Sequence, residues 1–327
     1  LAGQPSLTLR PGQQAVGLRM TLGTHMDRPD FVGHQKFALD EAILGNLLVN
    51  NFIVEPKNPD DAWIKRTSSR IGDWRATFRS TYFRWALAIN GLEIASKHYH
   101  SRKDEPRGFT IASFRSNGIE RIALWDFETA GENHKDTMPM LAAWAAADLY
   151  STMEEFVFDF YRVLLDLLPD SLIKGQEFRH LRKLRKEAAQ GGQHQTDWEV
   201  AWAERLGNWQ KKRLYDGLSK VFLSYIGVTG LKTPSIHELA TVETWADTIK
   251  GIGELRDCFA HGMTTVTKDL SEFSQKPHSM LFDFVEGEPL SIELRHLQSV
   301  ECFLDQLLTA INLSLIERAG YELPTRP

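Results

Sequence analysis

A short stretch near residue 260 combines the residue types needed for acid–base chemistry on a phosphate group. From Arg256 to Gly262 it reads Arg-Asp-Cys-Phe-Ala-His-Gly. Histidine can accept or donate a proton near neutral pH, and arginine can bind phosphoryl oxygens through two parallel hydrogen bonds. Cleavage of RNA by attack of the 2′-hydroxyl group on the adjacent phosphate needs both of these functions, and it needs no metal ion.

Helical spacing places this stretch at the end of a helix predicted over residues 235–261. The helix is indicated by apolar residues three and four positions apart: Ile249, Ile252, Leu255 and Phe259. Gly262 follows as a stop signal. Asp257 and His261 share one face of such a helix, so we expect the carboxylate to orient the imidazole by a hydrogen bond. Arg256 lies about 140° round the helix from His261, so the two flank one edge.

The spacing of Arg256 and His261 alone carries little weight, because roughly 0.7 such pairs are expected by chance in this composition. A surface arginine beside a histidine that stabilises the helix C-terminus is the alternative interpretation. The reaction also needs both a base and an acid, and one histidine is one proton carrier short. A two-fold dimer that brings two such helix ends together would supply the second.

Arg256, the polar Asp257, the mostly apolar positions that follow and His261 resemble the signature of the HEPN superfamily (higher eukaryotes and prokaryotes nucleotide-binding domains). The similarity covers about residues 137–320, with the motif late in its helix and one long helix after a short excursion. It implies a dimeric helical bundle with a composite active site at the dimer cleft. Arg256 and His261 would then be catalytic, and Asp257 would fill the polar position, which is often Asn in this family.

The resemblance therefore implies a metal-independent endoribonuclease without a cofactor that cleaves RNA at a homodimer cleft. Family members are largely ribonucleases of toxin–antitoxin, abortive-infection and CRISPR-type defence, so we expect an antiviral-defence or toxin effector with an antitoxin or activating partner. The family also has non-catalytic members. The alternative is thus a HEPN-like scaffold that binds a partner protein or a nucleotide. A general helical adaptor with a coincidental motif is a third interpretation.

Further side chains are candidates for supporting roles. Four basic residues on a predicted helix over residues 171–188 could bind the RNA backbone: Arg179, Arg182, Lys183 and Lys186. A solvated helix face is the favoured interpretation of them. Glu154 and Glu155 either line the dimer cleft and position Arg256 or form an exposed helix edge. Cys258 is expected in the core. The spacing of His and Cys residues indicates no metal site.

Composition excludes several classes of protein. The chain has 327 residues, 42% hydrophobic and 25% charged, as in an ordinary globular protein. Its net charge of −5 argues against a general nucleic-acid coating protein. Cys258 and Cys302 are the two cysteines of the chain, too few for a secreted disulfide framework. The most apolar predicted helix, over residues 138–168, is interrupted by charged residues, so we expect no membrane span and a cytoplasmic location.

The length favours two domains in a mainly α fold. We expect an irregular segment over residues 1–29, and an α+β domain over 30–130 for sensing, regulation or substrate selection. A polar linker at 131–136 would lead to a HEPN-like helical bundle over 137–322. The first domain is predicted to contain a helix near residues 37–48, an aromatic-striped helix from Trp74 to Ile89 and a small β-hairpin at Asn117-Gly118.

The helices predicted in the second domain lie near residues 138–168, 171–188, 196–227, 235–261 and 292–318. The last has an apolar face typical of a bundle core: Leu297, Val300, Leu304, Leu307 or Leu308, Ile311 and Leu315. Between the last two helices lie two short β-like runs, at 264–268 and 280–285. They form either a hairpin insertion or a loop.

Overall fold

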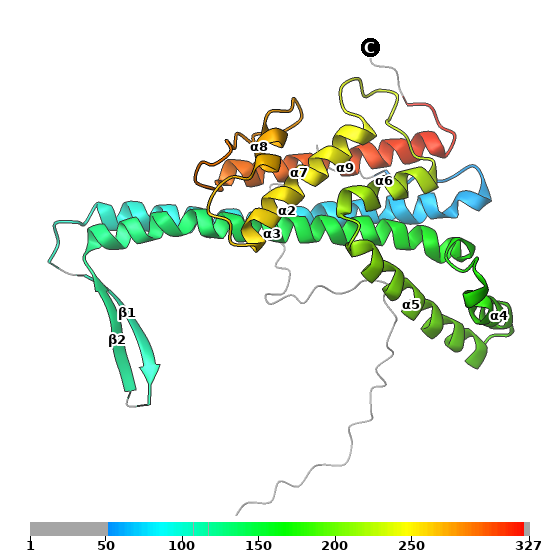
Figure 1. The fold of residues 1–327 in the computed structure, drawn as a ribbon, viewed down its shortest axis with the longest axis horizontal. Helices are drawn as coiled ribbons and strands as arrows, with labels where there is room; N and C mark the ends of the chain where they lie inside the picture. The colour runs from blue at the N-terminus through cyan, green and yellow to red at the C-terminus, as the bar shows by residue number, and fades with distance from the viewer. Residues whose placement is uncertain (1–51, 107, 117, 324–327) are drawn as a thin grey trace, which may run out of the picture. The chain divides into compact units, whose positions relative to one another are not determined.

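The computed structural model describes residues 52–106, 108–116 and 118–323. This part is mainly helical with one small antiparallel β-hairpin, as predicted (Figure 1). The helix predicted near residues 37–48 and the irregular segment predicted over 1–29 lie outside the described residues. In chain order the helices are η1 (Pro59–Asp61), α2 (Ala62–His100), α3 (Phe127–Leu167), η2 (Pro169–Ser171), η3 (Gln176–Phe178), α4 (Arg179–Glu187), η4 (Ala188–Gln190), α5 (Gln193–Leu214), α6 (Leu218–Thr229), α7 (Val242–Ala260), α8 (Lys268–Ser274) and α9 (Leu294–Arg318).

The two long helices α2 and α3 lie side by side and antiparallel (Figure 1). Trp85 Nε1 donates to the Asp148 carboxylate at 2.8 Å, and further along α2 Ser96 Oγ donates to the Gly131 carbonyl at 2.8 Å. The aromatic stripe predicted for α2 is confirmed, because its residues are buried or packed against the core: Trp74, Phe78, Tyr82, Trp85 and Ile89. The stripe therefore forms the face that α2 turns to the rest of the bundle.

The predicted β-hairpin is confirmed in the segment of chain that connects α2 to α3. Strand β1 (Phe109–Arg115) pairs antiparallel with β2 (Gly118–Trp125), and Phe114 lies opposite Ile119 next to the turn. Gly118 has φ +120°, a conformation that glycine adopts without strain, which explains its place after the turn.

The predicted linker at residues 131–136 is wrong, because these residues lie inside α3. The Asp126 carboxylate caps the helix by accepting from Thr129 N at 2.7 Å, so the helix begins before the polar run. Gly131 serves packing: a Cβ there would lie 2.3 Å from His100 Nδ1 on α2. The described residues belong to one compact unit, so the predicted boundary between a 30–130 domain and a 137–322 domain is not present in them.

Helix α2 is tied to the last helix as well as to α3. The Arg75 guanidinium, with its side chain 3% exposed, contacts the Asp305 carboxylate on α9 at 2.7 Å. All residues of the predicted apolar face of α9 are buried. Among the described helices, α9 is the one long and apolar enough to cross a membrane, but 61% of that segment is buried within the fold. This is how the core helix of a bundle behaves, so a membrane protein is not indicated.

Several predicted elements differ in their boundaries. The helix predicted over 196–227 is two helices, α5 and α6, separated at Gly217 with φ +81°. The helix predicted from residue 235 begins at Val242, where Thr241 caps it. The β-like runs at 264–268 and 280–285 form no hairpin with each other. Instead the excursion contains α8, with one isolated bridge between Thr265 and Pro289.

Candidate functional site

Helix α7 carries the Arg–His motif and is packed between α3 and α8. Two of its glycines allow this close approach. A Cβ at Gly251 would lie 2.4 Å from Phe273 Cδ1 on α8, and one at Gly253 would lie 3.2 Å from Tyr150 Cε2 on α3. Residues two positions apart on a helix point to roughly opposite sides, so α7 can contact α8 at Gly251 and α3 at Gly253. The motif at the end of α7 is thereby held in a fixed relation to α3.

Arg256 lies over the ring of Tyr150, with 4.6 Å between its guanidinium carbon and the ring centroid. The same guanidinium contacts the Asp257 carboxylate at 2.9 Å, from Nη1 to Oδ1. Its side chain is 35% exposed, whereas Tyr150 is 6% exposed. Burial raises the pKa of the Tyr150 hydroxyl above its ordinary value, while hydrogen bonding to Arg256 lowers it. The Tyr150 ring and the Asp257 carboxylate thus position the positively charged Arg256 guanidinium at the protein surface.

Glu154 lies one helical turn beyond Tyr150 and is half-buried, so the interpretation as an exposed helix edge is not supported. Burial raises the pKa of its carboxyl group, and the positive charge of Arg256 lowers it in part. Glu154 therefore adds a second acidic group near the guanidinium within one chain. One of the two interpretations of Glu154 places it across a dimer cleft from an arginine, whereas here the nearby arginine is Arg256 of the same chain.

His261 forms the C-terminal cap of α7 and is exposed. Its backbone N donates to the Asp257 carbonyl at 3.0 Å. Within the described part of the chain, no hydrogen bond joins the Asp257 carboxylate to the His261 imidazole, contrary to the expectation for this pair. The carboxylate is directed to the neighbouring guanidinium instead. Arg256 and His261 are both accessible at one helix end, as the helical spacing predicts.

An exposed apolar surface adjoins this end of α7. Trp144 on α3 meets the Phe259 ring edge-on, with centroids 5.0 Å apart and planes at 73°. Trp144 is 54% exposed, Met140 one turn earlier is 53% exposed and Met263 just after the motif is 44% exposed. We call these three residues the motif-end patch. A contiguous exposed apolar surface, unlike a single exposed residue, is typical of an interaction site.

Cys258 is 3% exposed, which confirms the expectation of a core position.

The four basic residues predicted to bind RNA lie on α4, away from the motif. Arg182 donates to the carbonyls of Ile173 and Gly175, so it fixes the preceding loop. Arg179, Lys183 and Lys186 are exposed. Helix α4 follows the end of α3 at Leu167, and about 25 Å of helix separate that end from Tyr150. The structure therefore does not bring α4 together with Arg256 and His261.

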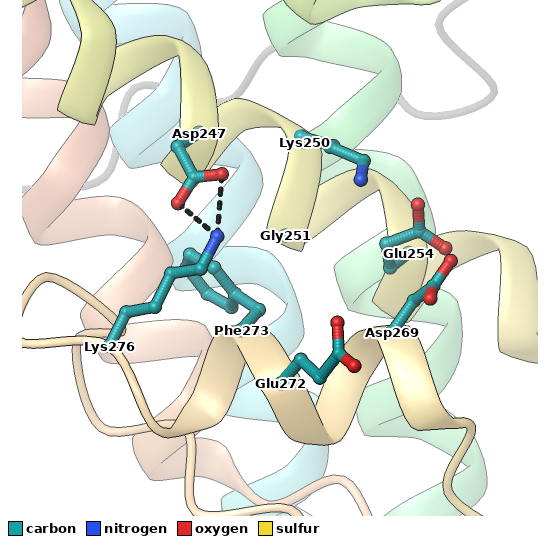
Figure 2. A pocket seen from close by; sticks show the side chains of 8 residues that line it. All are labelled: Asp247, Lys250, Gly251, Glu254, Asp269, Glu272, Phe273 and Lys276. Carbon is teal, nitrogen blue, oxygen red and sulfur yellow. Dashed lines mark hydrogen bonds and ion pairs between the residues drawn. The ribbon is translucent and has the colours of Figure 1, made fainter.

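A small hollow lies between α7 and α8, with a volume of about 40 Å³ (Figure 2). Asp247 accepts from Lys276 Nζ at 2.7 and 2.8 Å on one side, and the Glu254 and Asp269 side chains approach each other on the other. Burial, followed by the charge of Asp269, raises the pKa of Glu254. The volume is enough for a few water molecules and too small for a nucleotide.

A larger groove of about 440 Å³ lies at the opposite end of α7, between residues 236–240 and the side chains of Asp305, Gln306 and Thr309 on α9. Neither hollow includes Arg256 or His261. Among the described residues no group of three or more His, Cys, Asp or Glu side chains is arranged to hold a metal ion. The motif end of α7 is open surface, so enclosing a reacting group there requires a second surface.

Comparison of the chain with protein-family models, with curated proteins and with solved structures finds no match. Function is therefore inferred from the residues and their geometry. Two residues at the site were missed by the sequence interpretation, namely Tyr150 and Trp144. Glycines within an amphipathic helix often indicate close packing, so Gly251 and Gly253 were the available signal that a neighbouring helix approaches here.

Proposed function

We propose that the protein is a metal-independent endoribonuclease of the HEPN type. The observation that carries the proposal is that Arg256 and His261 are both accessible at the end of α7, with the Arg256 guanidinium held against Tyr150. A fixed cation and an exposed imidazole on one helix end match the needs of transesterification at a phosphate. The resemblance of the motif to the HEPN signature supports the same activity.

In the proposed reaction, each side chain has one role. The Arg256 guanidinium binds two non-bridging phosphate oxygens and offsets the charge that builds up as the 2′-oxygen attacks phosphorus. The His261 imidazole takes the proton from the 2′-hydroxyl or gives one to the leaving 5′-oxygen. A cyclic phosphate and a free 5′-hydroxyl result. Asp257 is a weaker participant than expected, since its carboxylate pairs with Arg256 instead of with the imidazole.

The second proton carrier in this proposal is the His261 of a second copy of the chain. The motif-end patch of Met140, Trp144 and Met263 supports a homodimer at this place, because it is exposed, apolar and next to the motif. Burying the patch between two copies would enclose both helix ends and exclude water from the phosphate. RNA outside the cleft would contact exposed basic residues, of which Arg179, Lys183 and Lys186 are candidates.

The biological setting is proposed from the resemblance alone. An enzyme of this type would act in the cytoplasm as a toxin or antiviral-defence effector, with an antitoxin or an activating partner that controls it.

The direct test is cleavage of total RNA by the purified full chain in excess EDTA. We expect cutting that is lost in His261→Ala and in Arg256→Ala and kept in two matched variants, His194→Ala and Arg66→Ala, which change an exposed histidine on α5 and an exposed arginine on α2. Equal cutting by wild type and His261→Ala would contradict the proposed role of the histidine.

A latent enzyme would give no cutting in that assay, so a second measurement is needed. Growth after induced expression separates wild type from His261→Ala without any knowledge of the trigger. We expect arrest with wild type and with His194→Ala, and normal growth with His261→Ala.

A non-catalytic scaffold is the second candidate. The ion pair between Asp257 and Arg256 favours it. Such a pair neutralises the arginine and can stabilise the helix end without taking part in catalysis. If wild type neither cuts RNA nor arrests growth, and His261→Ala and wild type capture the same partner, this candidate replaces the first.

A further inference from the structure

We propose that Tyr150 is the positioning residue of Arg256, holding its guanidinium so that the N–H edge faces outward to a phosphate group. The nature of the anion rests on the proposed function, whereas the positioning rests on contacts within α3 and α7. The guanidinium carbon lies 4.6 Å from the Tyr150 ring centroid, and the arginine side chain remains 35% exposed.

The ring of Tyr150 is itself well fixed. It is 6% exposed and lies on α3 between Leu149 and Met153, both of which are fully buried. Helix α7 approaches it so closely that a Cβ at Gly253 would lie 3.2 Å from Tyr150 Cε2. A buried ring packed this closely provides a constant surface for the guanidinium, which otherwise ends a long and flexible side chain.

An aromatic ring holds a cation in a way that a carboxylate does not. The ring face attracts the guanidinium through its quadrupole, so the positive charge is kept, and the N–H donors that are not paired with Asp257 or the Tyr150 hydroxyl stay available. Asp257 and Glu154 act in the opposite sense, because each draws the guanidinium toward a negative charge. Arg256 already contacts Asp257 with one nitrogen, and without the ring its remaining donors would turn toward these carboxylates, so it would bind a phosphate group more weakly.

The test follows the Arg256 Nε–Hε signal by NMR in the isotope-labelled full chain, assigned with Arg256→Lys. A proton held over a ring is shifted by the ring current, so we expect a shifted signal in wild type and in Tyr150→Phe and an ordinary one in Tyr150→Leu. Gly253→Ala is a second variant, because it pushes on the ring while favouring the helix. We expect it to move the Arg256 signal too.

Tyr161→Leu is the matched control for loss of a buried tyrosine on the same helix. Tyr161 is 4% exposed and its ring contacts Trp209 and Tyr225 rather than Arg256. We expect the Arg256 signal of this variant to remain as in wild type. Identical Arg256 signals in wild type, Tyr150→Leu and Gly253→Ala would overturn the proposal.

Binding and cleavage then separate positioning from the proposed reaction. Titration with inorganic phosphate should move the Arg256 signal of wild type at lower concentrations than that of Tyr150→Leu. In the RNA assay, kcat should fall by about 10²-fold in Tyr150→Leu, with a smaller change in KM. The loss should be smaller in Tyr150→Phe, which keeps the ring and lacks only the hydroxyl that hydrogen-bonds Arg256. If the phosphate and NMR results hold and wild type cuts no RNA, Tyr150 positions an anion-binding arginine and only the ribonuclease proposal fails. Equal phosphate affinity in wild type and Tyr150→Leu would overturn the positioning.

Discussion

The Tyr150 ring lies beneath the Arg256 guanidinium, although the two residues come from different long helices, α3 and α7. The contact links the buried core of the bundle to the accessible motif. On one side Tyr150 packs with the core, and on the other Arg256 reaches solvent. Motif and scaffold are therefore coupled, and substitutions on either side have measurable consequences.

Replacing Asp257 by Asn should release Arg256 for a ligand. The Arg256–Asp257 pair is 35% and 48% exposed, so its loss should cost less than about 1 kcal/mol of unfolding free energy. The guanidinium then has one competing carboxylate fewer, so the affinity for a single-stranded oligonucleotide lacking 2′-hydroxyls should rise. Fluorescence anisotropy measures this affinity.

Asp216→Asn is the matched control for Asp257→Asn. It removes the Arg213–Asp216 pair, which also spans 2.9 Å and is 38% and 42% exposed. We expect a similar change in stability and unchanged oligonucleotide affinity. Weaker binding by Asp257→Asn than by wild type would show that Asp257 supports the ligand rather than competing with it.

A charge placed in the motif-end patch should disrupt the proposed dimer. Met140→Arg changes a residue that is 53% exposed, so the monomer fold is preserved. An unpaired charge buried in the interface should weaken dimerisation by more than about tenfold. Sedimentation velocity over a range of protein concentrations checks the result.

Val200→Arg provides the comparison on α5, where Val200 is 60% exposed. It should sediment as wild type does. A wild-type chain that is monomeric at every concentration while it cuts RNA would refute the composite site.

Removing the Asp305 carboxylate should strongly destabilise the fold. Arg75, with its side chain 3% exposed, and Arg79 both contact this carboxylate. Burial lowers the pKa of Arg75, which reflects the cost of its charge in the core. Asp305→Ala leaves that charge without its main counter-charge, so the unfolding free energy should fall by about 3–5 kcal/mol. Urea denaturation gives the value.

Asp170→Ala serves as the comparison, since its pair with Arg185 is 75% and 36% exposed. Its effect should be within about 1 kcal/mol. If the two variants lose equal stability, the link from α2 to α9 contributes less than its burial implies.

The contact between α7 and the segment that follows α8, made by Asp247 with Lys276 and His278, should weaken at acid pH. Burial raises the pKa of Asp247, but hydrogen bonds and charge from Lys276 and His278 outweigh it and hold the pKa below its ordinary value. A carboxyl group with a depressed pKa in the folded state stabilises the fold above its ordinary pKa, and this contribution is lost as pH falls through the folded value. Asp247→Asn should lower the unfolding free energy at neutral pH by about 1–2 kcal/mol. It should also flatten the decline of Tm toward acid pH.

Glu272→Gln changes an exposed carboxylate at the same hollow and should leave the acid decline as in wild type. An equally steep decline in Asp247→Asn and wild type would exclude Asp247 as its source.

The sequence by itself determined the features that depend on neighbouring residues. The stripe from Trp74 to Ile89, the hairpin at Gly118 and the apolar face of α9 were all predicted, because periodicity and turn conformation are local properties. The placement of Arg256 and His261 at an accessible helix end follows from the same periodicity. Local pattern also misled, since polar residues at 131–136 resemble a linker and in the fold lie within α3.

Only the tertiary structure decided which partners the motif side chains take. Helical spacing allows Asp257 to reach either His261 or Arg256, and the structure pairs it with Arg256, whose guanidinium is already held over Tyr150. That arrangement exists because α7 packs closely on α3 at Gly253. Contacts between distant segments depend on how helices pack, and packing depends on the shapes of whole surfaces rather than on the spacing within any one of them.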